Sequence, residues 1–114
     1  MKPRFISDIH LSENNSHLTN AFKRFLNESK ESCSHLFILG DLFEAWIGDD
    51  DNNAYHQEIK ELLIEFTING PETFFIHGNR DFLIGQDFAK EVGISLLPDP
   101  YTVDINGLKV ILSH

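Results

Sequence analysis

The chain has 114 residues, of which 41% are hydrophobic and 24% charged, a size and composition that fit one small domain with a buried core. Its formal net charge of −9 excludes the basic surface on which nucleic-acid binding depends, so we expect no nucleic-acid partner. The acidic excess reflects either solubility or carboxylates that stand close together and need a cation between them.

The first part of the chain alternates strand-like and helix-like segments. A short strand is predicted around Phe5-Ile6 and a second over Leu36–Leu39. Between them a polar loop offers Asn15 or Ser16 as the N-cap of an amphipathic helix that runs to about Ser29. The apolar residues of that helix recur at helical spacing: Leu18, Ala21, Phe22, Phe25 and Leu26.

After an irregular stretch from Leu42 to Asn53, a second helix is predicted. Its apolar face is marked by Ile59, Leu62, Leu63 and Phe66, and Asn69-Gly70-Pro71 ends it. Thr73–Ile76 predicts a third strand, Phe82–Glu91 a shorter helix closed at Gly93, and Ile94–Leu97 a further strand.

The last segment carries a strong hairpin signal. Asn106-Gly107 separates the runs Tyr101–Ile105 and Leu108–Leu112, and both turn residues tolerate positive φ. The predicted order is therefore β-α-β-α-β-α-β followed by a hairpin, which indicates a layered α/β fold with an antiparallel addition.

Metal-ligand residues follow the strands of this pattern. Asp8 and His10 come after the first strand, and Asp41, which we take as the centre of the set, follows the second. Asn79 comes after the third, and His114 follows the last apolar run. The carboxyl ends of parallel strands meet at one edge of a sheet, where ligands bind. Carboxylate oxygen and imidazole nitrogen suit Mn, Fe or Zn.

Each motif alone has an ordinary explanation. Asp-x-His also occurs in solvated loops, although a continuing strand pleat would point Asp8 and His10 to the same side. Gly78-Asn79-Arg80-Asp81 also fits a turn that caps the next helix, with Asp81 as N-cap. Arg80 adds a fork-shaped cation matched to phosphate oxygens.

The motifs in combination resemble the calcineurin-like metallophosphoesterases, whose signature is D-x-H, G-D, G-N-[H/R]-[D/E], a strand-end His and a later G-H-x-H. The blocks Ile38–Asp51 and Phe75–Leu83 are similar to family members that hydrolyse a nucleotide-sugar lipid in lipid A synthesis. The resemblance implies an αββα sandwich, of which residues 1–114 form the N-terminal part of a single domain, incomplete at the C-terminus.

The resemblance also implies two divalent metal ions, usually Mn²⁺. By motif, Asp8 and His10 would bind the first ion, Asp41 would bridge both, and Asn79 and His114 would bind the second. A bridging carboxylate is physically apt, since two dications about 3.5–4 Å apart repel each other without an anion between them.

The implied catalytic residues are Asp41, Asn79 and Arg80, and Asn79 and Arg80 would grip the substrate phosphate. The reaction would be hydrolysis of a pyrophosphate bond, with attack on the α-phosphate and release of UMP. Many family members have His where this chain has Arg80. Because Arg cannot act as a general acid at neutral pH, its role here is expected to be electrostatic.

Three alternatives stay open. No Gly-His-x-His occurs in the chain, so these residues form either part of an active enzyme or a catalytically inert fragment of one. A calcineurin-like phosphoesterase with another substrate is the second alternative. An acidic-pocket receiver or phosphatase is the third, and His10 argues against it because such proteins carry paired acids early in the chain.

The remaining features concern location. Cys33 is the single cysteine, which excludes an internal disulfide and fits a reducing compartment. We expect no signal peptide, and no apolar run approaches the roughly 20 residues of a membrane span. The resemblance implies a monomer on the cytoplasmic face of the inner membrane, in peripheral contact with it. His17, His35 and His56 are expected at the surface.

Overall fold

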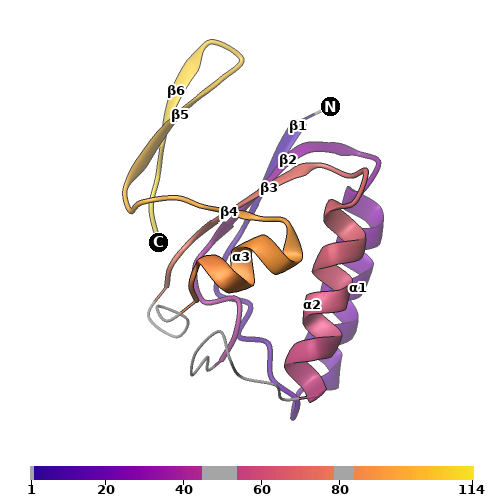
Figure 1. Ribbon diagram of the computed structural model, residues 1–114. Helices are drawn as coiled ribbons and strands as arrows, with labels where there is room; N and C mark the ends of the chain where they lie inside the picture. Colours follow the sequence, from indigo (N-terminus) through magenta and orange to yellow (C-terminus); the bar gives the residue numbers. More distant parts are fainter. Residues whose placement is uncertain (1, 45–53, 79–83) are drawn as a thin grey trace.

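The computed structural model describes residues 2–44, 54–78 and 84–114 (Figure 1). The predicted order of elements is confirmed. The elements are β1 (Lys2–Ile6), α1 (Ser16–Ser29), β2 (Cys33–Leu39), α2 (Ala54–Thr67), β3 (Glu72–Ile76), α3 (Gln86–Val92), β4 (Ser95–Leu96), β5 (Tyr101–Ile105) and β6 (Leu108–Leu112).

The centre of the fold is a parallel sheet with strand order β1-β2-β3-β4. Phe37 of β2 lies opposite Phe5 of β1 on one side and Phe74 of β3 on the other. Each connection between these strands contains a helix, as parallel pairing requires. The carboxyl ends of the strands consequently lie along one edge; Asp8 and His10 follow β1 there and Asp41 follows β2, whereas His114 follows β6 of the hairpin.

Helices α1, α2 and α3 cover one face of the sheet and form the main core. Asn15 caps α1 as predicted, because its side chain accepts a hydrogen bond from the Leu18 backbone N–H at 3.2 Å. Fully buried strand residues on this face, such as Ile38 of β2 and Phe75 of β3, belong to one apolar cluster with helix residues such as Leu63 and Phe88. Burial of this apolar surface is the main stabilising term of the fold.

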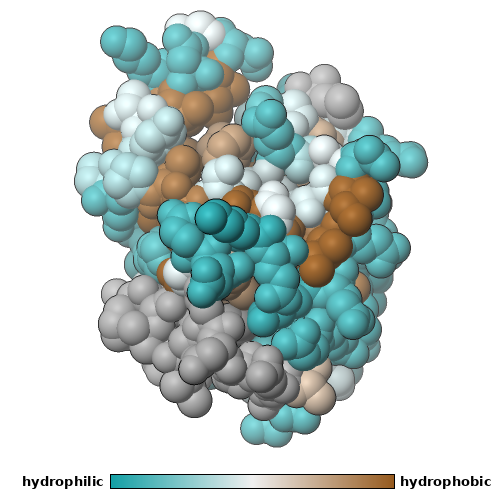
Figure 2. Space-filling view, viewed as in Figure 1, coloured by the Kyte–Doolittle hydropathy of each residue, from teal (hydrophilic) through white to brown (hydrophobic). Residues whose placement is uncertain are grey.

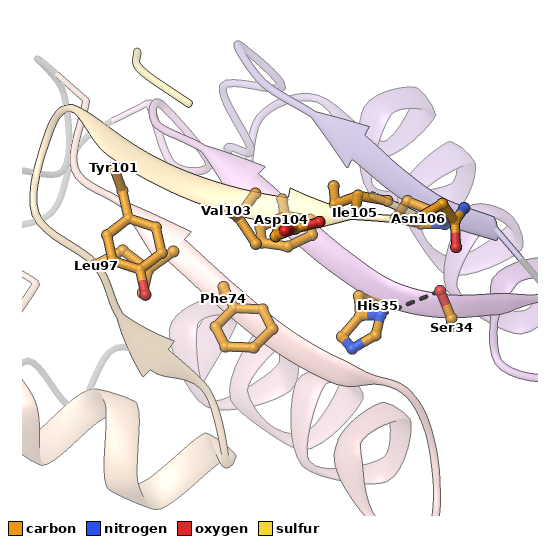
Figure 3. A pocket seen from close by; sticks show the side chains of 11 residues that line it. Ser34, His35, Phe74, Leu97, Tyr101, Val103, Asp104, Ile105 and Asn106 are labelled. Atoms are coloured by element: carbon orange, nitrogen blue, oxygen red, sulfur yellow. Dashed lines mark hydrogen bonds between the residues drawn. The ribbon is translucent and has the colours of Figure 1, made fainter. Parts of the chain in front are cut away.

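The opposite face of the sheet carries a row of stacked rings. Phe37 stacks on Phe5 and Phe74 with ring centroids 5.1 and 5.0 Å apart. The β5–β6 hairpin lies on this side, away from α1 and α2 (Figure 1). A cleft of about 230 Å³ runs between hairpin and sheet, lined by residues such as Phe74 and Tyr101 (Figure 3).

The hairpin leaves apolar side chains in solvent. Leu108 and Ile111 are 70% and 72% exposed, and apolar surface is visible over the hairpin in Figure 2. At its turn, Asn106 and Gly107 both have positive φ, as predicted. The helical layer, the parallel sheet and this hairpin represent three layers of the expected sandwich. In the described part of the chain, no second layer of helices covers the outer side of the hairpin.

Several predicted boundaries need correction. β2 begins at Cys33 rather than Leu36, because buried Cys33 pairs with Lys2 of β1. α3 begins at Gln86 rather than Phe82, since Ile84 and Gly85 precede the helix as coil and Gly85 is its N-cap. Within the described ranges, no helix combines the length and apolarity that crossing a membrane requires.

Candidate metal centre

The segments that follow β1 and β2 stay side by side beyond the sheet. Asp8 N donates to Gly40 O at 3.1 Å, and His10 N donates to Asp41 O at 3.0 Å. Leu11 continues the pairing by donating to Leu42 O at 2.8 Å. These main-chain bonds fix the two ligand-bearing segments relative to each other, although neither is a regular strand.

Three non-glycine residues here adopt left-handed backbone conformations. Asp8, His10 and Asp41 have φ values of 55°, 53° and 53°. The strand pleat of β1 therefore does not continue to His10, and the two side chains converge through these left-handed conformations instead. Such conformations are unfavourable for side-chain-bearing residues and cluster at functional sites. Their coincidence at one sheet edge marks this edge as the candidate site.

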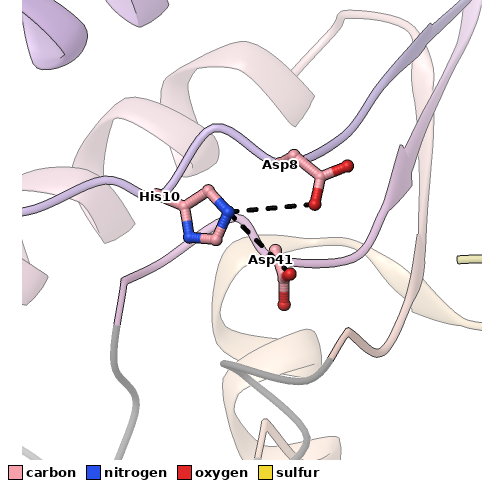
Figure 4. A group of neighbouring side chains, drawn as sticks. All are labelled: Asp8, His10 and Asp41. Carbon is pink, nitrogen blue, oxygen red and sulfur yellow. Dashed lines mark ion pairs between the residues drawn. The ribbon is translucent and has the colours of Figure 1, made fainter.

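The side chains of these three residues form one cluster (Figure 4). His10 Nε2 lies 3.8 Å from Asp8 Oδ1 and 3.9 Å from Asp41 Oδ2. The Asp41 side chain is only 7% exposed, whereas that of Asp8 is 59% exposed. A buried carboxylate facing a second carboxylate is unfavourable without positive charge between them.

His114 is a second histidine that contacts Asp41. Its Nε2 is 3.4 Å from Asp41 Oδ2, and its Nδ1 lies 2.8 Å from the Leu39 carbonyl oxygen. A carbonyl oxygen only accepts, so Nδ1 carries the proton and Nε2 presents a lone pair toward Asp41. This is the arrangement in which metal-binding histidines are usually held. Two imidazoles thus direct Nε2 at the Asp41 carboxylate, whose bridging role stays a prediction.

Two glycines make this close packing possible. A Cβ on Gly40 would lie 2.7 Å from the Gly78 Cα atom and would collide with the His114 ring. A Cβ on Gly78 would lie 2.9 Å from Asp41 Cγ and would meet the Asp41 backbone nitrogen. The turns after β2 and β3 therefore touch through backbone atoms, which holds the Asp41 carboxylate in place.

The cluster fits a divalent cation. Oxygen and nitrogen ligands bind such ions at about 2.0–2.2 Å, which spreads neighbouring ligand atoms by about 3–4 Å. His10 Nε2 lies 3.8 Å from Asp8 Oδ1 and 3.9 Å from Asp41 Oδ2, and His114 Nε2 lies 3.4 Å from Asp41 Oδ2. Asp8, His10 and Asp41 each offer one ligand atom, and these atoms lie within 4.8 Å of one another. The donor set is also the one that Mn, Fe or Zn accepts.

Two predicted site residues cannot be placed. Asn79 and Arg80 lie outside the described residues, as do Asp81, Trp46 and Asp49-Asp50-Asp51. Their predicted roles stay predictions. A hydrogen bond joins residues that precede and follow the 79–83 segment: His77 Nε2 lies 2.5 Å from the Ile84 carbonyl oxygen.

The other histidines lie outside the cluster. His17 is exposed, and His35, which lies in β2, is also exposed, as expected. The surface prediction is wrong for His56, whose half-buried ring packs edge-on against Phe43 with centroids 5.1 Å apart. His56 therefore contributes to packing.

The sequence analysis missed Glu44. Its Oε2 lies 3.1 Å from Nδ1 of His10, on the side of the ring that faces away from Asp8 and Asp41. The residue is part of the block Ile38–Asp51, but no spacing rule links it to His10. Only the pairing of the two segments brings these side chains together.

Comparison with known proteins agrees with this geometry. The sequence profile described as "Calcineurin-like phosphoesterase" matches residues 1–113. The chain belongs to this family. The family prediction made from the four motifs is thereby confirmed, and so is the fold class. Divalent metal ions follow as the cofactors that the family implies, in agreement with the cluster of Asp8, His10 and Asp41.

Individual relatives share almost the whole chain. A protein of Photorhabdus laumondii named UDP-2,3-diacylglucosamine hydrolase is 50% identical over 110 residues, which are 96% of this chain and 46% of that protein. Proteins of the same name from Aeromonas hydrophila and Pseudomonas aeruginosa are 47% and 46% identical over 114 residues, 47% and 48% of their lengths. The chain therefore spans about half the length of the curated relatives it matches.

Solved structures show the same fold at lower identity. The nuclease MPE of Pseudomonas putida superposes with a TM-score of 0.62 at 22% identity, covering 88% of this chain and 49% of that one. A protein of unknown function from Aquifex aeolicus superposes with a TM-score of 0.58, also at 22% identity, covering 98% of this chain and 59% of that one. At this identity the likeness concerns the fold alone.

Proposed function

We propose that this chain is the metal-binding part of a hydrolase that cleaves the pyrophosphate bond of UDP-2,3-diacylglucosamine, giving UMP and 2,3-diacylglucosamine 1-phosphate in lipid A biosynthesis. The observation that carries the proposal is the position of Asp41, a buried carboxylate at the edge of the sheet that the Nε2 atoms of His10 and His114 approach to 3.9 and 3.4 Å. The names of relatives at 46–50% identity supply the substrate.

The proposal assigns two divalent ions, Mn²⁺ by preference, to the ligands Asp8, His10, Asp41, Asn79 and His114. When bound, such ions supply positive charge to a reacting phosphoryl group and activate a water molecule for attack. Asp41 would contribute a carboxylate to both ions. His114 contributes Nε2 because Leu39 O holds its Nδ1 proton.

Asn79 and Arg80 are proposed to bind the phosphate of the substrate. Arg80 would act through charge and paired N–H donors, since a guanidinium keeps its protons at neutral pH. Replacement of Arg80 by Ala is expected to lower the rate of UMP release while leaving the Mn²⁺ content unchanged. Loss of bound Mn²⁺ in the Arg80→Ala protein would instead assign Arg80 a structural role.

The main test supplies UDP-2,3-diacylglucosamine in detergent micelles with Mn²⁺ and measures UMP by chromatography. Release that disappears in Asp41→Asn supports the proposal. Tight Mn²⁺ binding without UMP release would support the alternative that these residues are an inactive part of the enzyme. Hydrolysis of other phosphodiesters, but not of this lipid, would mean that the enzyme acts on a substrate other than UDP-2,3-diacylglucosamine.

We further propose that the protein acts as a monomer in peripheral contact with the cytoplasmic face of the inner membrane. The support is the substrate named in its relatives, whose two acyl chains hold it in a bilayer, since each buried CH₂ contributes about 0.8 kcal/mol. Sedimentation with vesicles that contain the substrate tests the contact, and light scattering tests the monomer. A protein that stays in the supernatant would refute the membrane contact.

A further inference from the structure

The two imidazoles of the site are held in different ways. His114 donates its Nδ1 proton to the Leu39 carbonyl oxygen at 2.8 Å and keeps Nε2 for Asp41. His10 also directs Nε2 at the carboxylates of Asp8 and Asp41, which fixes Nδ1 as the proton-bearing atom whenever Nε2 binds an ion. The Nδ1 proton of His10 therefore needs an acceptor of its own.

Nδ1 of His10 is buried, and among the residues that the structure describes it has no hydrogen-bond partner of good geometry. A buried donor without an acceptor is unfavourable, so such atoms are rare in folded proteins. The nearby acceptor is Glu44 Oε2, at 3.1 Å. This distance is that of an N–H···O hydrogen bond, and only the angle between the Nδ1–H bond and the Glu44 oxygen is unfavourable. The Glu44 side chain is 48% exposed, so its carboxylate can rotate into line.

The backbone of Glu44 is placed for this contact. Glu44 N donates to Leu11 O at 2.9 Å, directly after the bridge between Leu11 and Phe43. Leu11 and Phe43 are 1% and 0% exposed. The residue that follows His10 and the residue that precedes Glu44 are thus locked together in the core, which keeps the two side chains adjacent.

We propose that Glu44 is a positioning residue for His10. Its carboxylate accepts the hydrogen bond of His10 Nδ1–H, selects the tautomer with a free Nε2, and aims that atom at the ion shared with Asp8 and Asp41. A carboxylate behind a metal-binding imidazole raises its basicity as well as fixing its orientation. The proposal rests on the metal site of the proposed function but not on its substrate.

The first test measures Mn²⁺ affinity by calorimetric titration. We expect Glu44→Ala to weaken Mn²⁺ binding by about 10–100-fold, the usual effect of removing such a partner. Glu44→Gln should restore much of the loss, because its amide oxygen accepts the same hydrogen bond. The matched control is Glu72→Ala. Glu72 also faces a histidine, His35 at 3.9 Å, but lies outside the site, so its removal should leave Mn²⁺ binding unchanged.

A second measurement reads the hydrogen bond itself. In the Zn²⁺-loaded protein labelled with ¹⁵N on histidine, the Nδ1 proton of His10 should be observed, shifted downfield and protected from exchange with water. It should move upfield and exchange faster in Glu44→Ala, while the Nδ1 proton of His114 stays in place. The wild-type spectrum alone tests the proposal if Glu44→Ala does not fold.

Several outcomes would overturn the assignment. Unchanged Mn²⁺ affinity in Glu44→Ala would do so, as would a His10 Nδ1 proton in fast exchange in the wild type. An equal loss in Glu72→Ala would show a general charge effect instead. Absence of any metal binding in the wild type would remove the metal site itself. A protein that binds Mn²⁺ as expected but releases no UMP would refute only the proposed function.

Discussion

Gly40 offers a test of how the site is held together, because Gly107 provides a matched comparison. The two residues have nearly the same left-handed backbone, with φ of +86° and +83°. An Ala in this conformation costs about 1–2 kcal/mol at either position. At Gly107 a Cβ would meet nothing within 4 Å, whereas at Gly40 it would lie 2.7 Å from Gly78 Cα and 2.8 Å from His114 Cγ.

A steric cost is therefore added to the cost of backbone strain in Gly40→Ala alone. Forcing an extra methyl group into a packed region costs about 1–3 kcal/mol. We expect Gly40→Ala to lower the free energy of unfolding by about 2–5 kcal/mol in total and Gly107→Ala by about 1–2 kcal/mol. The collision also displaces His114, so Gly40→Ala should weaken Mn²⁺ binding and Gly107→Ala should not.

Urea unfolding followed by circular dichroism measures both free energies, with the slope m as a check that the denatured states are alike. Calorimetric titration measures Mn²⁺ binding of the same two proteins. Equal destabilisation by the two substitutions would show that backbone strain alone matters at Gly40. Unchanged Mn²⁺ affinity in Gly40→Ala would refute the argument that this glycine keeps His114 in its place.

Three further predictions address the ligands and the core. Mn²⁺ at 100 times its dissociation constant should stabilise the protein by about 2.7 kcal/mol in thermal unfolding. This gain should vanish in Asp41→Asn, which loses the central carboxylate. It should persist in Asp104→Asn, a substitution on the exposed hairpin. Burial raises the pKa of the Cys33 thiol, and the opposing effect of nearby Arg4 is smaller. Iodoacetamide at pH 8 should therefore label Cys33 only after unfolding. Rapid labelling of the folded protein would contradict the burial of this residue. Phe75→Ala should lower the free energy of unfolding by about 3–5 kcal/mol, because Phe75 is 0% exposed. Phe5 is 41% exposed, so Phe5→Ala should lower it clearly less. Equal losses in the two variants would contradict the placement of the core.

The sequence by itself determined the order of elements and pointed to the candidate ligands. Apolar residues at helical spacing predicted α1 with its cap Asn15, and Asn106-Gly107 predicted the hairpin, because such signals depend on neighbours along the chain. The motifs around Asp8 and Asp41 likewise marked the family and the edge of the sheet where the site lies.

Only the tertiary structure decided how those ligands are held. A continuing strand pleat could have pointed Asp8 and His10 to the same side, but left-handed backbone orients them instead. Hydrogen bonds to the segment after β2 maintain this backbone. Glu44 lies beside His10 because Leu11 pairs with Phe43, a contact between segments far apart in the chain. No local pattern specifies such a contact, since it depends on the register of two strands and on the core that fixes it.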